Sequence, residues 1–193
     1  MTTKPLRADA ERSVRSILEA AERVLSGNPA ASMEQVAEAA GVARTTVHRR
    51  FASRQALVDA MASTAVQQLL EAIEAGRPET APPLVALHQI TVNVLRTKVS
   101  WAFALGQPAA SGSVVAEMQQ QVVRRCLELL DRVRDLGVLD PEADLDWTRR
   151  VYYALIGESL HDADTDADVL ASRIIDTLLR GAGPRRPDSQ RPR

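Results

Sequence analysis

Basic and hydroxyl side chains are concentrated between residues 44 and 54, in a stretch that has no acidic residue between its two end positions. A guanidinium group can donate two hydrogen bonds to one guanine, and hydroxyl groups can contact base edges in the major groove of DNA. Other donors at the margins of such a face suit phosphate oxygens. The residue types therefore favour nucleic-acid recognition, with Thr45, Thr46 and Arg49 placed for bases and His48 and Arg50 for phosphates.

A helix over 44–51 would put these side chains on one face. At 100° per residue, Val47 and Phe51 lie within about 40° of each other and must face a core. The opposite arc then carries Thr45, Thr46 and Arg49, with the other donors at its edges. A solvated basic face is the alternative interpretation for any one of these residues, but it explains the whole arc less well.

The residues before this helix predict the element that would hold it. The stretch 33–52 reads MEQVAEAAGVARTTVHRRFA, with Ala37 in a first helix, Gly41 in a turn and Val47 in a second helix. A helix-turn-helix needs a small residue where its helices cross, a residue that tolerates a left-handed conformation in the turn, and an aliphatic residue that packs the second helix down. Ser32 and Gln35 also form a capping box. The joint spacing predicts a helix-turn-helix rather than an ordinary helical hairpin.

The rest of the chain also has helical periodicity, so the predicted fold class is all-α. Apolar residues recur every three or four positions between Gly and Pro breakers, in the segments 10–26, 53–76, 83–105, 113–136, 144–161 and 166–180. No segment alternates as a half-buried strand does. The residues from Gly183 onward have the composition of a disordered tail.

Composition excludes several classes of protein. A single cysteine, Cys126, leaves no disulfide scaffold, and no run approaches the length of a membrane span. We therefore expect a cytoplasmic protein without a membrane segment. Three histidines on different segments, and an acidic run over 162–168 that lacks the Gly and Glu of a calcium loop, predict no metal site and no cofactor.

The net charge of −1 is a sum over unlike segments. Residues 1–54 carry nine Lys/Arg and six Asp/Glu, residues 55–179 carry ten and eighteen, and residues 180–193 carry five and one. These counts give +3, −8 and +4. A basic head on an acidic body suits a protein that meets DNA with one end only.

Residues 9–76 resemble the DNA-binding part of TetR-type transcriptional regulators, through SILEAAERVLSGNP, SMEQVAEAAGVARTTVHRRF and SRQALVDAM. The resemblance implies a helix-turn-helix domain over 1–56 and a helical ligand-binding and dimerisation domain over 57–183, with 184–193 as a basic tail. It also implies a homodimer on a palindromic operator and a small-molecule effector. By position, the resemblance also implies that Arg44 joins the base contacts and that Arg54 contacts a phosphate. Family residues are replaced at four positions: His48 stands for Tyr, Arg50 for a frequent His, Arg54 for Lys, and Ala43 for a capping Ser or Thr.

Within the body, the resemblance places an effector pocket among the segments 84–105, 113–130 and 145–160. Candidate lining residues are His88, Asn93, Trp101, Met118, Gln121 and Tyr152, although core packing or surface exposure explains each one alone better than ligand binding does. The last two segments are apolar over about half of the helical wheel, which is typical of helices buried on two sides. The second side would be covered by a partner subunit, and a fully buried core helix is the alternative interpretation. The residues predicted to meet a partner subunit are Leu145, Tyr152, Ile156, Leu170, Ile174 and Leu178.

The favoured function is a ligand-responsive transcriptional repressor. Two alternatives remain open at this point. One is a protein of the same fold that has lost DNA binding and acts through protein partners, for which His48 and Ala43 argue. The other is an all-α enzyme, although the sequence has no glycine-rich phosphate loop, GxSxG elbow or HExxH motif.

Overall fold

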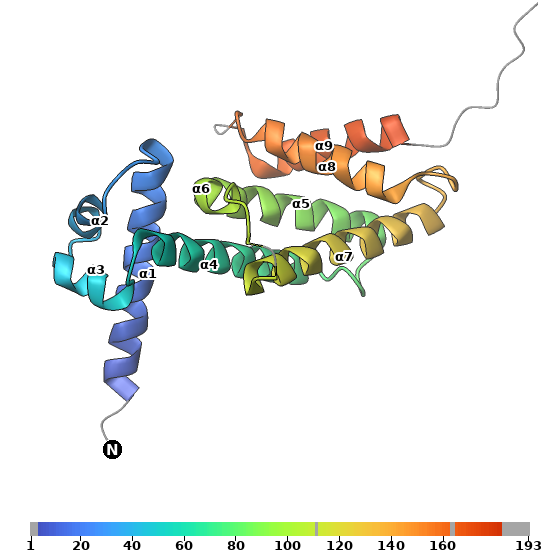
Figure 1. The fold of residues 1–193 in the computed structure, drawn as a ribbon. Helices are drawn as coiled ribbons and strands as arrows, with labels where there is room; N and C mark the ends of the chain where they lie inside the picture. The colour runs from blue at the N-terminus through green and yellow to red at the C-terminus, as the bar shows by residue number, and fades with distance from the viewer. Residues whose placement is uncertain (1–3, 111, 163–164, 183–193) are drawn as a thin grey trace, which may run out of the picture. The chain divides into compact units, whose positions relative to one another are not determined.

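The computed structural model describes residues 4–110, 112–162 and 165–182 (Figure 1). These residues form helices joined by turns and contain no strand, which confirms the all-α prediction. The helices are Lys4–Gly27 (α1), Met33–Ala39 (α2), Arg44–Arg50 (α3), Arg54–Ala75 (α4), Pro83–Ser100 (α5), Ala102–Leu105 (α6), Val114–Asp135 (α7), Leu145–Ser159 (α8) and Ala167–Ala182 (α9).

The chain forms two compact units. The first contains the residues through Gln67 together with Ser100–Met118, and the second contains Gln68–Val99 and the residues from Gln119 onward. The sequence-based boundary after residue 56 separates DNA-reading from ligand-sensing residues, and it stays a prediction about function. The predicted tail 184–193 lies outside the described residues.

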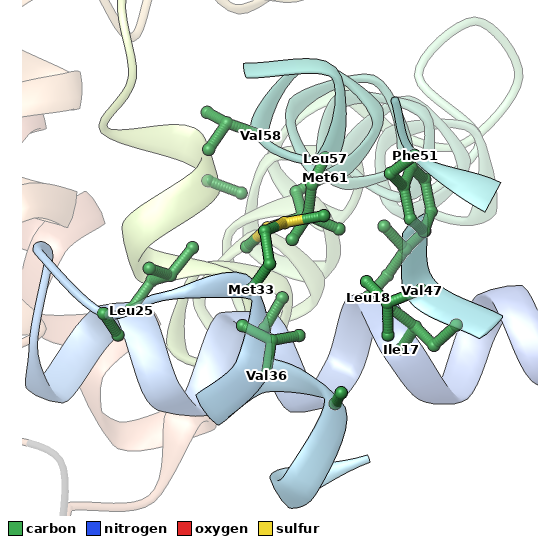
Figure 2. Close-up of a cluster of buried hydrophobic side chains, with 14 of the residues drawn as sticks. Ile17, Leu18, Leu25, Met33, Val36, Val47, Phe51, Leu57, Val58 and Met61 are labelled. Carbon is green, nitrogen blue, oxygen red and sulfur yellow. The ribbon is translucent and has the colours of Figure 1, made fainter. Parts of the chain in front are cut away.

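The first unit is held by an apolar cluster to which α1, α2, α3 and α4 all contribute (Figure 2). Ile17 from α1, Val36 from α2, Val47 from α3 and Leu57 from α4 are almost completely buried there. Burying one such side chain stabilises the fold by about 1.5–3 kcal/mol. The cluster therefore fixes α3 against the other three helices.

Local chemistry sets the turn between α2 and α3. Gly41 has φ of +66°, the left-handed conformation that the spacing predicted. At the start of α2, the Gln35 backbone N–H donates to Ser32 Oγ at 3.3 Å, and the Ser32 backbone N–H donates to Gln35 Oε1 at 2.9 Å. The predicted capping box and helix-turn-helix are both confirmed.

The predicted helix over 83–105 is interrupted at Trp101, so α5 and α6 are separate. The Glu22 carboxylate, only 5% exposed, accepts the backbone N–H groups of Phe103 at 2.6 Å and Ala104 at 3.1 Å. In a continuous helix these groups would donate to carbonyls one turn earlier. A buried acid 81 residues away in the sequence thus ends the helix, which no local pattern shows.

The second unit is built from α5, α8 and α9 with the last part of α4 and most of α7. Leu130, Leu139 and Leu178 are completely or almost completely buried in it. The turn after α4 packs closely, because a Cβ on Gly76 would lie 2.3 Å from Ile90 Cγ1. Arg132 of α7 donates to the carbonyl oxygens of Pro78 and Ala81 in the same turn. Among the described residues, no helix is long and apolar enough to cross a membrane.

Candidate nucleic-acid interface

The donors of α3 lie on its outward side. Val47 is buried in the core, and Phe51 at the end of the helix is 7% exposed. Thr46 is half-buried beside them, whereas the other predicted contact residues of this helix are exposed: Arg44, Thr45, His48, Arg49 and Arg50. No acidic residue belongs to α3. The helix thus presents hydroxyl, imidazole and guanidinium donors to solvent from a rigid base.

A carboxylate on the neighbouring helix reaches this face. Arg44 Nη2 lies 2.6 Å from Glu34 Oε1, and Arg44 Nε donates to His48 Nε2 at 3.5 Å. His48 Nε2 is 4.0 Å from the same Glu34 oxygen. Hydrogen bonds to the Glu34 carboxylate from its own backbone N–H and from Ser32, and then the charge of Arg44, lower its pKa. Sequence reasoning missed Glu34 because it precedes the basic stretch.

Arg54 has a second set of partners. Its Nε donates to the Ala31 carbonyl oxygen at 3.4 Å, and its Nη2 donates to the Pro29 carbonyl oxygen. Beside it, the Ser53 hydroxyl caps α4 by accepting the Ala56 backbone N–H at 3.1 Å. The first turn of α4 is therefore anchored to the loop between α1 and α2. A phosphate contact by Arg54 has to share its guanidinium with these carbonyls.

The start of α3 has no side-chain cap, as the alanine at position 43 predicted. The Ala43 carbonyl oxygen accepts the Thr46 backbone N–H at 2.8 Å, and the first amides of the helix remain open to other acceptors. Phosphate oxygens are acceptors of this kind.

The six residues predicted to line an effector pocket have different surroundings. In the second unit, Tyr152 is buried with its hydroxyl 2.8 Å from Thr91 Oγ1, and His88 Nε2 lies 3.2 Å from Ser172 Oγ. Asn93 donates to the Ala72 carbonyl oxygen at 3.0 Å. In the same unit Gln121 is exposed, and in the first unit Met118 is half-buried and Trp101 belongs to the apolar cluster. Their role in ligand binding stays a prediction.

Two polar atoms in the second unit are buried without a hydrogen-bond partner among the described residues: Arg149 Nε and Tyr153 Oη. The Arg149 guanidinium carbon lies 5.2 Å from the centre of the Tyr153 ring. Burial, and then the neighbouring Cys126 thiol, raises the pKa of Tyr153 well above its ordinary value. An unsatisfied buried polar atom is costly unless a ligand or water satisfies it. Periodicity could not single out these two residues, because it reports a buried side but not hydrogen-bond satisfaction.

The residues predicted for a subunit interface require a correction. Leu145 is half-buried. The other five are buried inside the single chain: Tyr152, Ile156, Leu170, Ile174 and Leu178. The helices α8 and α9 pack side by side (Figure 1). The buried side chains of both arcs are therefore covered within this chain. Helical periodicity identifies the apolar faces of these two helices, but it does not tell whether the same chain or a partner subunit covers them.

Comparison with known proteins gives the family. The model described as "Bacterial regulatory proteins, tetR family" matches residues 17–61, from α1 into α4. The HTH-type transcriptional repressor LfrR of Mycolicibacterium smegmatis (strain ATCC 700084 / mc(2)155) is 32% identical over 185 residues, 93% of each chain.

Solved structures agree with this match. The TetR-like regulator LfrR from Mycobacterium smegmatis in complex with proflavine has a TM-score of 0.72 at 28% identity, covering 88% of this chain and 96% of that chain. PfmR, a TetR family regulator from Thermus thermophilus, has a TM-score of 0.72 at 20% identity, with 88% and 99% covered, and shares the fold. This protein therefore belongs to the tetR family of DNA-binding bacterial transcriptional regulators.

Proposed function

We propose that the protein is a ligand-responsive repressor that binds a palindromic operator as a homodimer. The observation that carries the proposal is the outward face of α3, which offers arginine and threonine donors on a helix packed against α1, α2 and α4. The similarity to LfrR, which is named as a repressor, supports the direction of control.

The donors of the face divide by chemistry. Arg44, Thr45, Thr46 and Arg49 are proposed to contact bases, because guanidinium and hydroxyl groups match base edges in the major groove. His48, Arg50 and Arg54 are proposed to contact phosphates, which position the helix without reading sequence. Thr46 is half-buried, so less of its side chain is open to DNA than that of the exposed Thr45.

A homodimer is proposed through the outer faces of α8 and α9. Trp147 on α8 is 60% exposed, and Val151 one turn later is half-buried on the same side. On α9, Ile175 and Leu179 are half-buried one turn apart. A two-fold interface places the same patch of both subunits together, and two linked heads can read two half-sites of a palindrome.

The effector is proposed to be a small organic molecule held in the second unit. LfrR was solved with proflavine, a small aromatic compound. Here the buried Arg149 Nε has no hydrogen-bond partner among the described residues, and small-molecule sites are mostly apolar with a few such polar groups. An effector that binds better to one arrangement of the dimer than to another shifts DNA affinity by that difference.

The test uses the full chain and a pool of DNA duplexes with a randomised centre. We expect repeated selection to enrich a motif with two-fold symmetry, and the affinity for it to fall by orders of magnitude between low and moderate salt. Random duplexes of the same length are the control. Equal binding to the selected and random pools would overturn the proposal in favour of a protein that acts through other partners.

A further inference from the structure

We propose that Glu34 of α2 determines specificity: its carboxylate, together with the His48 imidazole, orients the Arg44 guanidinium toward a single base. The inference rests on the proposed function, because it assigns how the same face reads DNA. Glu34 itself is a positioning residue that acts through Arg44.

The Arg44 guanidinium is held along one of its edges. Its Nη2 lies 2.6 Å from Glu34 Oε1, and its Nε donates to His48 Nε2 at 3.5 Å. These two nitrogens form the side edge of the planar group. Nη1 has no hydrogen-bond or ion-pair partner in the part of the chain that the structure describes. The end edge, Nη1 with the second N–H of Nη2, is thus left for two parallel hydrogen bonds to one acceptor pair.

The open end edge of the Arg44 guanidinium matches the acceptors of guanine. Guanine presents O6 and N7 in the major groove as adjacent acceptors that match a bidentate arginine. A free arginine loses side-chain freedom when it makes this contact, and prior ordering reduces that loss. The Arg44 side chain is 66% exposed and the Glu34 side chain 44%, so their ion pair contributes little to folding stability. Its effect is therefore on the orientation of Arg44 rather than on the fold.

The negative charge of Glu34 also affects how Arg44 meets DNA. Glu34 is ionised near neutral pH, as an ordinary glutamate is, and its hydrogen bonds and the charge of Arg44 lower its pKa further. A carboxylate at this place repels phosphate oxygens, and it disfavours an alternative pose in which Arg44 turns to the DNA backbone. The same carboxylate weakens general attraction to DNA. Glu34 thus lowers the affinity for random DNA and raises the discrimination between base pairs.

The experiment selects motifs from the randomised duplex pool with four full-length variants beside the wild type: Glu34→Gln, Glu34→Asp, Arg44→Ala and Glu38→Gln. We expect Glu34→Gln to reduce discrimination about five-fold or more at the position that Arg44→Ala affects, within the range of a bidentate guanine contact. Its binding to random duplexes rises. Glu34→Asp keeps the charge but shortens the reach, so discrimination falls while random binding stays at the wild-type level.

Glu38→Gln is the matched control, because it removes the same charge from an exposed position of the same helix. We expect it to leave discrimination unchanged. Circular dichroism melting of each variant checks the fold. An unchanged preference in Glu34→Gln, or an equal loss in Glu38→Gln, overturns the role of Glu34 while the selected wild-type motif keeps the proposed function. A wild type that selects no motif overturns both.

Discussion

The Glu22 carboxylate of α1 accepts the backbone N–H of Phe103 at 2.6 Å, and it also accepts the Ala104 N–H and the Ser26 hydroxyl. A buried carboxylate is stable only when hydrogen bonds or opposite charges replace its lost water. Here the two amides and the hydroxyl provide that replacement. The contact attaches α6, and with it the segment between α5 and α7, to the helix that supports the DNA-reading face.

Glu22→Gln should therefore lower the stability of the fold. The amide side chain keeps the shape but loses the charge of the acceptor, and we expect a loss of about 1.5–3 kcal/mol in the free energy of unfolding. Urea denaturation followed by circular dichroism measures it. Glu19→Gln, an exposed position on the same helix, should change it by less than about 0.5 kcal/mol. Equal effects of the two variants would show that the Glu22 contact is not stabilising.

The sequence predicts the helix-turn-helix well because its determinants are local. Gly41 and Val47 report a turn conformation and a buried position through their spacing alone. The hydrogen bond between Glu22 and Phe103 joins residues 81 positions apart, and no sequence pattern near either residue predicts it. For the same reason Glu34 was missed at the candidate site: it becomes part of the α3 face only when the turn brings α2 alongside.

Arg49→Ala and Arg54→Ala should weaken DNA binding in different ways. Arg49 is exposed on α3, and its loss should relax the preferred motif with little effect on folding. Arg54 donates to the carbonyl oxygens of Pro29 and Ala31, so its loss should lower the melting temperature as well as the affinity for every sequence. Its salt slope should fall by about one, the value expected for one phosphate contact.

Fluorescence anisotropy over a salt series, with selected and random duplexes, separates these two effects. Thermal melting of the same preparations supplies the stability arm. Uniform weakening of all sequences by both variants would contradict the division into base and phosphate contacts.

Leu179→Arg should convert the proposed homodimer into monomers. Leu179 is half-buried on the outer side of α9, and a charge there would be taken out of water on association without a counter-charge. Light scattering coupled to size exclusion gives the mass directly. Val85→Arg, at an exposed apolar position of α5, is the matched control and should leave the mass unchanged. A dimeric Leu179→Arg variant would place the interface elsewhere.

Because of Cys126, we expect the free energy of unfolding to fall in alkaline solution. Cys126 is half-buried, and the loss of water around its thiol raises the pKa from an ordinary 9.0 to about 12, an effect that the Tyr153 hydroxyl and Arg149 only partly oppose. Between these values the unfolded chain releases a proton that the folded chain retains. The thiol's contribution to stability is complete below about pH 9 and is lost as the pH rises toward 12. The loss approaches about 1.4 kcal/mol per pH unit for one proton.

The measurement is the free energy of unfolding from about pH 8 to about pH 10.5 for the wild type and for Cys126→Ala, whose slope should be shallower. Burial also raises the pKa values of Tyr152 and Tyr153, and the Cys126 thiol adds to both shifts. The difference in slope between the two proteins therefore reports the thiol together with its coupling to these two tyrosines. Alkylation supplies a second readout, because the chain has one cysteine. Iodoacetamide at about pH 8 should label the chain quickly in urea and slowly in buffer, since the thiolate is the nucleophile. Equal labelling rates in the two solutions would show that the thiol is not buried in the native protein.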